Sequence, residues 1–492
     1  MKTNRKSEVL RNASALFSAH LIGRLLSLIL TVFILPQKPN VITESDIGCY
    51  FLAVFIAGLV ASIAELGLQG PLIREITLNK NLAQDYIGNA LIIRLLLSIL
   101  AFGFIISVNY WLNYTDLTFR LIILLGAAEL INGLAQIYRC LFRAFEQMKY
   151  ESVTVIAERL TVVLVGGGLI WFEMADLGEF GLIVLIGSVL NLILNLSIAR
   201  LRFVNFMFRL NWKLWKTLMK QALPFALGNM FNLVYFRLDM ILLSKLITNT
   251  TEAQSANAWY GLAFTIVNAF TILPGAYMGA VFPVMSREFE RKTVQFRYVY
   301  TDAIRWMVLL ALPFTIGLAL VSEQIAAQFF PKLEWRQIVL PLRLLSISGG
   351  LTFLTTVNIT VLRATDQRLA FSILMFVTLS TNLLLNLSFI PQYQHVGSAV
   401  SMIGSESILF IMSSIFIHRS ISKLEYIRFI WKSVIVSILM AIGLYFTPSV
   451  LIWIRIFGAT MVYFGLMWCW GELGSLKKKT VYEEKSRNKL VS

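Results

Sequence analysis

Long apolar stretches recur along almost the whole chain, from Ser14 to Trp470. Each holds about twenty residues, the length that a helix needs to cross the roughly 30 Å hydrocarbon core of a bilayer. The composition agrees, because 57% of the 492 residues are hydrophobic and only 14% are charged, which is far too apolar for a soluble chain. The sequence therefore predicts an all-α integral membrane protein without a soluble domain.

The number of stretches predicts about fourteen transmembrane helices. The basic segment MKTNRKSEVLRNAS precedes the first stretch. No A-x-A-like cleavage site follows, so we interpret this stretch as a spanning helix and not as a signal peptide. The expected spans are 14–35, 47–69, 86–109, 119–142, 152–172, 180–199, 222–247, 258–284, 302–322, 340–362, 369–390, 396–417, 429–447 and 450–470.

The positive charges gather in alternate loops. Most of the 43 Lys and Arg residues lie in the N-terminal tail, in every second loop and in the C-terminal tail, whereas the intervening loops hold only Lys38, Lys332 and Arg336. Cytoplasmic loops of membrane proteins carry this excess, so both termini are expected in the cytoplasm.

A basic cluster with two tryptophans connects the sixth and seventh spans. We interpret it as an interfacial linker on an anionic lipid surface, and we interpret 476–492 as a polar tail. Nucleic-acid binding is the weaker alternative for both segments, and we expect no nucleic-acid partner. The cluster contains Arg200, Arg202, Arg209, Lys213, Lys216 and Lys220.

An internal repeat relates the two halves of the chain. RAFEQ at 143–147 matches RATDQ at 363–367, at an offset of about 220 residues. Because six spans separate the copies, the repeats are parallel, and two six-helix lobes would enclose a central cavity and rock to give alternating access. Weaker matches in the same order pair Tyr50 with Tyr260, Arg74 with Arg287, Arg24 with Arg237, and Gly187 with Gly404.

The repeat divides the chain into five expected parts. They are an N-terminal lobe at 1–199, a basic cytoplasmic linker at 200–221, a C-terminal lobe at 222–417, helices 13 and 14 at 418–475, and the tail at 476–492.

Polar residues form stripes within several predicted spans. Ionisable groups at this depth cost several kcal/mol unless they face protein or water, so each is a candidate for function. The spacings of three and four residues place each stripe on one helix face. The candidates for a substrate cavity are His20, Arg24 and Ser27 on the first span, Glu129, Asn132 and Gln136 on the fourth, and Asn229, Asn232, Arg237 and Asp239 on the seventh.

Arg24 and Arg237 fall near the middle of their spans, at equivalent places in the two lobes. A guanidinium can grip a phosphate through two parallel hydrogen bonds, so two of them facing one cavity suit a diphosphate. The alternative is an ion pair with Glu129 or Asp239 that holds the lobes together.

Three carboxylates are candidates for coupling transport to an ion. Glu65 and Glu406 lie deep in their spans, and Asp239 shares the seventh span with Arg237. A purely structural contact between helices is an equally open interpretation for these groups.

Motifs for chemistry are absent from the sequence. It contains no GxxxxGK[ST] nucleotide-binding loop, and its three His and three Cys residues are scattered without metal-ligand spacing. We therefore expect no metal, no cofactor and no enzymatic activity. The short external loops argue against a glycan polymerase, which stays the least favoured alternative.

Short sequence words resemble the Wzx-type polysaccharide flippases, in the MOP superfamily that also holds MATE exporters and lipid II flippases. The words are DIGCY at 46–50, ELGL at 65–68, RE at 74–75, RAFE at 143–146, LPF at 223–225, YFRLD at 235–239, FP at 282–283 and SR at 286–287.

This resemblance implies a V-shaped pair of six-helix lobes. It also implies that the cargo is an undecaprenyl-diphosphate-linked oligosaccharide, carried from the cytoplasmic to the outer face of a bacterial inner membrane for lipopolysaccharide or exopolysaccharide synthesis. Arg24 and Arg237 would then meet the diphosphate, and membrane lipids, a polysaccharide polymerase and glycosyltransferases are the expected partners. A MATE-type multidrug or cation antiporter is the alternative transporter, although its cavity is expected to be acidic or aromatic.

Overall fold

The computed structural model describes residue 16 and residues 18–204, 210–291, 295–421, 427–447 and 451–471. Side chains are described for these residues except 217, 221–227 and 427–430. Arg209, most of the segment before the first span and the tail at 476–492 lie outside the described residues, as do the side chains of the LPF word. Every regular element within the described ranges is helical, which confirms the predicted all-α fold class.

The N-terminal lobe contains the first six predicted spans. The first helix, 18–37, changes to a π-helix at η1 (Ile29–Ile34) and a 3-10 turn at η2 (Leu35–Gln37). The other elements are α2 (Glu44–Glu65), α3 (Gln69–Leu78), η3 (Lys80–Leu82), α4 (Ala83–Leu112), α5 (Asp116–Ala144), α6 (Met148–Leu160), η4 (Thr161–Gly167), α7 (Gly168–Trp171) and α8 (Leu177–Arg202).

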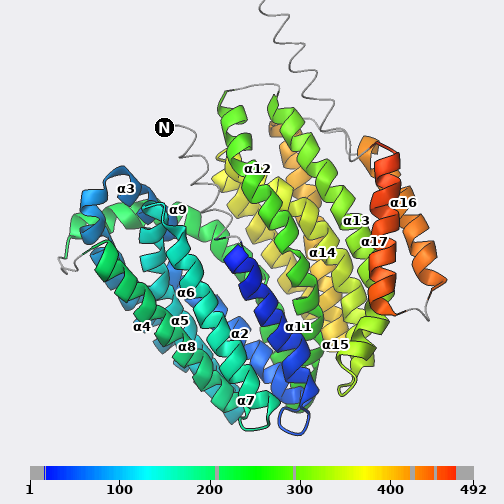
Figure 1. Ribbon diagram of the computed structural model, residues 1–492, viewed down its shortest axis with the longest axis horizontal. Coiled ribbons are helices and arrows are strands. Elements are labelled where there is room, and N and C mark those ends of the chain that lie inside the picture. Colours follow the sequence, from blue (N-terminus) through cyan, green and yellow to red (C-terminus); the bar gives the residue numbers. More distant parts are fainter. Residues whose placement is uncertain are drawn as a thin grey trace, which may run out of the picture.

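The C-terminal lobe follows, with two helices packed on its outside. Figure 1 shows α16 and α17 beside α13, at the edge farthest from the N-terminal lobe. The elements are α9 (Trp212–Tyr235), α10 (Leu238–Leu246), α11 (Thr250–Phe270), α12 (Ile272–Glu290), α13 (Gln295–Phe329), α14 (Trp335–Ala364), α15 (Arg368–Ser420), α16 (Ile427–Tyr445) and α17 (Ile452–Cys469).

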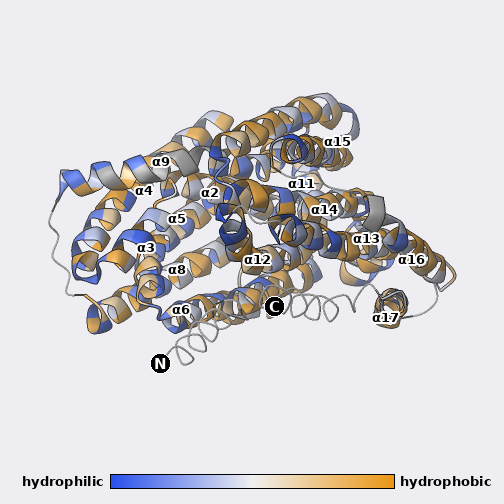
Figure 2. Ribbon diagram, turned by 90° about the horizontal axis from the view of Figure 1, so that it is seen from above, coloured by the Kyte–Doolittle hydropathy of each residue, from blue (hydrophilic) through white to orange (hydrophobic). Residues whose placement is uncertain are grey.

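Eleven helices among the described residues are long and apolar enough to cross a membrane. Hydrophobic residues colour much of the helices in both lobes (Figure 2). The count of fourteen stays a prediction. It divides α15 at Gln394, where φ 48° and ψ −128° interrupt the helix, and it adds the predicted spans 222–247 and 429–447.

Local sequence signals start two of the helices. Thr43 accepts a hydrogen bond from the backbone N–H of Asp46, whose carboxylate accepts from the Thr43 backbone, and Asp176 and Glu179 repeat this reciprocal arrangement before α8. Each pair satisfies backbone donors that a helix start leaves open. The two helices therefore begin at sharply defined residues.

The two lobes meet along α2 and α11, where glycine permits very close approach. A Cβ atom added at Gly48 would lie 1.7 Å from the carbonyl oxygen of Gln254, and one added at Gly261 would lie 2.5 Å from the ring of Phe51. Small residues allow helix backbones to approach in this way within membranes. Any larger residue at Gly48 must push the two lobes apart.

Hydrogen bonds between the lobes concentrate at one end of the molecule, which we call the closed end. It comprises the segments 37–44, 112–116, 244–254 and 329–334. In Figure 1 the lobes converge there and separate toward α3 and α12. The bonds run from Gln37 Nε2 to Phe329 O (2.9 Å), Lys332 Nζ to Gln37 O (2.7 Å), Gln254 Nε2 to Thr115 Oγ1 (3.2 Å) and Glu334 N to Glu44 Oε2 (3.1 Å), and they join the Tyr114 and Ser244 hydroxyls (3.1 Å).

Candidate functional site

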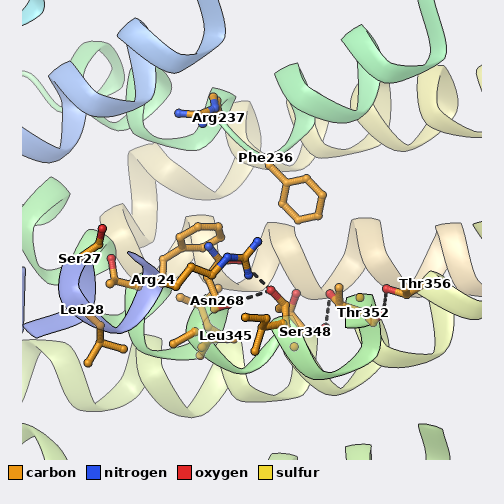
Figure 3. Close-up of a pocket in the computed structure, with 18 of the residues that line it drawn as sticks. Arg24, Ser27, Leu28, Phe236, Arg237, Asn268, Leu345, Ser348, Thr352 and Thr356 are labelled. Carbon is orange, nitrogen blue, oxygen red and sulfur yellow. Dashed lines mark hydrogen bonds between the residues drawn. The ribbon is translucent and has the colours of Figure 1, made fainter. Parts of the chain in front are cut away.

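A cavity of about 690 Å³ lies between the two lobes. Its N-terminal wall consists of residues from the first helix, α2, α5 and α6. Most of its C-terminal wall comes from α9, α11, α12, α14 and α15. Figure 3 shows that polar side chains from both lobes surround this space. Among the described residues that line it, four are arginines and two are glutamates, so the formal charge of the wall is positive.

The N-terminal wall carries charged side chains that form no described hydrogen bond or ion pair. Arg24, Arg159 and Glu129 line the cavity, and none of them forms a hydrogen bond or ion pair with another described residue. Arg24 and Glu129 are exposed to the cavity, and Arg159 is partly exposed. The guanidinium groups can therefore donate all their N–H bonds to a ligand or to water.

Arg237 lies at a break in its span and not within a continuous helix. It precedes α10 with φ −122° and ψ −9°, whereas the sequence placed it near the middle of the seventh helix. Its Nη1 atom donates to the carbonyl oxygens of Val54 (3.1 Å) and Phe55 (3.4 Å) on α2. A Cβ atom added at Gly58 would lie 2.2 Å from Nη1. Arg237 thus ties the lobes through backbone carbonyls and pairs with neither Glu129 nor Asp239 among the described residues.

Helix α14 contributes a row of hydroxyl groups to the C-terminal wall. Ser348, Thr352, Thr356 and Thr360 follow one another at intervals of four residues and all line the cavity. A spacing of four keeps side chains on one helix face. This wall therefore offers uncharged hydrogen-bonding groups opposite the arginines of the N-terminal wall.

Arg363 closes the row of hydroxyls on α14. Its Nη2 atom donates to Asn229 Oδ1 at 3.1 Å, and its guanidinium lies 4.8 Å from the centre of the Phe371 ring. The arginine lines the cavity, whereas Asn229 does not. The predicted site residue Asn229 therefore does not line the cavity itself but holds the side chain of Arg363, which does.

Glu406 is the buried carboxylate of the cavity wall. Only 1% of the residue is exposed, and it accepts hydrogen bonds from the Tyr235 hydroxyl (3.2 Å) and the Thr355 hydroxyl (3.1 Å). All the described hydrogen-bond donors to this carboxylate are neutral groups, so no described cation compensates its charge.

Four predicted site residues of the N-terminal lobe lie away from this cavity. Asn132 donates to Glu158 Oε1 at 2.8 Å and lines only a small neighbouring space of about 100 Å³. His20 Nε2 lies 3.7 Å from Glu151 Oε1, and Glu65 accepts a hydrogen bond from Gln69. Gln136 is not among the residues that line the cavity.

Asp239 also lies away from the cavity, in a buried polar cluster of the C-terminal lobe. It accepts hydrogen bonds from the Tyr260 hydroxyl (2.5 Å) and from Asn386 Nδ2 (2.8 Å), and Ser398 donates to Asn386 Oδ1 at 3.0 Å. The predicted cavity residues Arg24, Ser27, Glu129, Asn232 and Arg237 do line the cavity, and so does Glu406, which was predicted as a coupling residue.

Several cavity residues were missing from the sequence-based candidates. Arg159 lies within about two turns of the end of its predicted span, and a long side chain at such a position can also reach the membrane surface. The hydroxyl row on α14 has the helical spacing that identified the stripe on the fourth span, and Arg363 belongs to a repeat word. A search of the predicted span 340–362 for polar residues at helical spacing would have found the hydroxyl row. Asn268 had no such signal.

Within the part of the chain that the structure describes, no group of three or more His, Cys, Asp or Glu residues could hold a metal ion. Cys49 and Cys140 are buried free thiols. The chemistry of the cavity is therefore that of arginine, carboxylate, amide and hydroxyl groups.

Comparisons with known proteins relate the whole chain to membrane transporters. The sequence profile described as "Polysaccharide biosynthesis protein" matches residues 9–289. The probable low-salt glycan biosynthesis flippase Agl15 of Haloferax volcanii is 22% identical over 447 residues, which cover 88% of this chain and 89% of that protein.

Solved structures share the fold at low sequence identity. The lipid II flippase MurJ in an inward closed conformation superposes with a TM-score of 0.75 at 15% identity, covering 93% of this chain and 99% of that chain. An inward-facing MATE multidrug resistance transporter of the MOP superfamily gives 0.61 at 15% identity, covering 87% and 96%.

The family match confirms the predicted relation to polysaccharide biosynthesis proteins, and the structural likenesses confirm the predicted fold. The profile alone spans more than half of the chain. The protein therefore belongs to the polysaccharide biosynthesis protein family and has the MurJ-like and MATE-like fold of the MOP superfamily.

Proposed function

We propose that the protein is a flippase that moves a lipid-linked glycan precursor across the membrane. The observation that carries the proposal is a cavity between two lobes with unpaired arginines, Arg24 and Arg159, on its wall. A diphosphate offers negative charge and several acceptor oxygens, and a guanidinium supplies charge and paired donors. The family and the names of its relative Agl15 and structural neighbour MurJ point in the same direction.

The detailed proposal is that the cargo is an undecaprenyl-diphosphate-linked oligosaccharide. Its diphosphate and sugar would enter the cavity while the lipid tail stays in the bilayer. The excess of Lys and Arg in alternate loops supports cytoplasmic termini, and in a bacterial inner membrane the closed end would then face outward. Rocking of the lobes would break the bonds at the closed end and release the cargo on the outer face.

Two buried carboxylates are the proposed coupling groups. Glu406 and Asp239 are held by hydroxyl and amide donors with no described ion pair. Binding of a proton or a cation would neutralise either group, which could favour one arrangement of the lobes over the other. Glu65, which lies outside the cavity, is a weaker candidate for this role.

The test is the sidedness of lipid-linked oligosaccharide in cells that lack this protein. Without it, the oligosaccharide should accumulate on the cytoplasmic face, and the wild-type chain should clear it. The double variant Arg24→Ala, Arg159→Ala should fail, whereas Arg200→Ala, which removes an exposed arginine outside the cavity, should complement.

The same cells separate the proposal from drug export. The MATE-like fold makes a multidrug antiporter the second candidate. If oligosaccharide reaches the outer face without the protein while ethidium efflux depends on it, the flippase proposal is wrong and drug export replaces it.

A further inference from the structure

The hydroxyl row on α14 has a hydrogen-bonding direction. Thr352 donates to the carbonyl oxygen of Ser348 (3.0 Å), Thr356 to that of Thr352 (2.6 Å) and Thr360 to that of Thr356 (2.7 Å). The first two bonds are drawn in Figure 3. A threonine hydroxyl has one proton to donate and two lone pairs to accept with. The Thr356 and Thr360 protons point to the helix backbone, and the Thr352 proton points to the backbone or to the neighbouring Glu406 carboxylate. These oxygens therefore offer acceptor sites to the cavity.

The spacing makes the acceptors a regular track. Four residues of an α-helix rise about 6 Å, so the three threonine oxygens are separated by steps of about that length along the cavity wall. Of these groups, Figure 3 places Thr352 and Thr356 side by side along α14. A single short ligand group cannot reach all of them, whereas an extended chain of polar units can.

Ser348 independently supports the interpretation of this row as a ligand-binding surface. The residue lies four positions before Thr352, lines the same cavity and is only 2% exposed. Its hydroxyl forms no hydrogen bond with any described residue. The hydroxyl oxygen itself is not enclosed by protein, so it is open to a ligand or to water from the cavity.

We propose that Ser348, Thr352, Thr356 and Thr360 form a binding track for the sugar part of the cargo. This inference rests on the proposed flippase function and names the ligand of one wall. Sugar hydroxyls and acetamido N–H groups are donors that fit acceptor oxygens. A phosphate has only acceptor oxygens and negative charge, so it finds no donor on the three threonines and binds the cavity arginines, which lie on the opposite wall and, with Arg363, at the end of the row. The cargo therefore presents uncharged sugar units with free hydroxyl groups to α14.

The experiment measures lipid binding to the purified full chain in detergent. The probes are undecaprenyl diphosphate without sugar, undecaprenyl-diphosphate-N-acetylglucosamine, and the same lipid with its sugar hydroxyls methylated. The variant is Thr352→Val, Thr356→Val, Thr360→Val, which removes the oxygens at nearly constant shape. The matched control changes the same three residues to Ser and keeps every hydroxyl.

The wild type should bind the glycosylated lipid more tightly than either the bare or the methylated lipid. The valine variant should lose this preference by about tenfold, as expected when a few neutral hydrogen bonds disappear. Its affinity for undecaprenyl diphosphate should stay unchanged, which also shows that it is folded. The serine control should behave as the wild type.

Two results would overturn the proposal in distinguishable ways. If the valine variant keeps the full preference for the glycosylated lipid, the track does not bind sugar, although the flippase proposal survives. If the wild type binds none of the three lipids, the flippase proposal fails, and the assignment of this wall to sugar fails with it.

Discussion

The two lobes hold their buried carboxylates in different ways. In the N-terminal lobe, Glu151 accepts two hydrogen bonds from Arg143 (2.8 and 2.6 Å), and Glu158 lies 3.7 Å from Arg139 while it also accepts from Asn132. In the C-terminal lobe, Asp239 and Glu406 accept only from neutral tyrosine, asparagine and threonine donors among the described residues. Arginine side chains therefore compensate the negative charges of Glu151 and Glu158, whereas only neutral hydrogen-bond donors surround Asp239 and Glu406.

This difference separates carboxylates whose charge stabilises the fold from carboxylates whose charge can change. A buried carboxylate beside an arginine stays ionised, because the loss of its charge would strand the cation in a low-dielectric interior. A carboxylate held by neutral donors leaves no cation behind when it takes up a proton or a metal cation. The N-terminal lobe is thus expected to behave as a rigid scaffold, and the C-terminal lobe as the part whose charge can change during transport.

The largest predicted effect follows from breaking the N-terminal network. Glu158→Gln should lower the free energy of unfolding by about 3 to 5 kcal/mol, the usual cost of leaving one buried partner uncompensated. Thermal unfolding of the purified chain measures it. Glu129→Gln, on the cavity wall without a described hydrogen bond or ion pair, should change stability by less than about 0.5 kcal/mol. Equal effects of the two substitutions would refute the distinction between them.

The two equivalent arginines should differ in what their loss changes. Arg24→Ala should weaken binding of a lipid diphosphate about 10- to 100-fold, since charged hydrogen bonds contribute about 1.5 to 3 kcal/mol, with stability nearly unchanged. Arg237→Ala should chiefly lower the unfolding temperature, because it removes a tie between the lobes. Calorimetry and lipid binding on both variants test this. A shared phenotype would contradict the different roles assigned to them.

The contact between the lobes gives a smaller effect. Gly48→Ala places a methyl group 1.7 Å from a backbone carbonyl of α11, which cannot rotate away. Overpacking of this kind should cost about 1 to 3 kcal/mol, measured by thermal unfolding. Gly103→Ala is the matched control on α4, because its Cβ atom would meet nothing within 4 Å. If Gly48→Ala is as stable as this control, α2 and α11 do not meet as described.

The smallest effect on stability is expected for the adjustable carboxylate. In Glu406→Gln the Tyr235 and Thr355 hydroxyls can still donate to the amide oxygen, so the loss should be about 1 kcal/mol. Transport measured over a range of pH and sodium concentrations should become less sensitive to at least one of the two. A loss of stability as large as that of Glu158→Gln would place Glu406 with the scaffold and remove it from coupling.

The fold could be predicted well from the sequence because its causes are local or repeated. Apolar length sets each membrane span, and the words at 143–147 and 363–367 relate the two lobes. Breaks inside spans were harder to anticipate. The sequence around Arg237 looks helical, yet the chain interrupts its helix there, where the guanidinium reaches α2 across the space that Gly58 leaves open.

The candidate site was only partly predictable. A polar stripe shows that one face of a helix avoids lipid, but it does not show whether that face meets water or another helix. On α5, Glu129 lines the cavity while Asn132, one turn away, turns to Glu158 inside the lobe. Spacing alone cannot separate these cases, because both side chains lie on the same stripe.

The sequence by itself determined the membrane fold class, the internal repeat and the helices that carry polar groups, because hydrophobic length and periodicity are properties of the chain alone. Only the tertiary structure decided which of those groups share the cavity and which are buried with partners. Arg24 and Arg237 occupy equivalent positions in sequence, but one is unpaired on the cavity wall and the other holds two lobes together. A partner from a distant helix made that difference, and no pattern within either span encodes it.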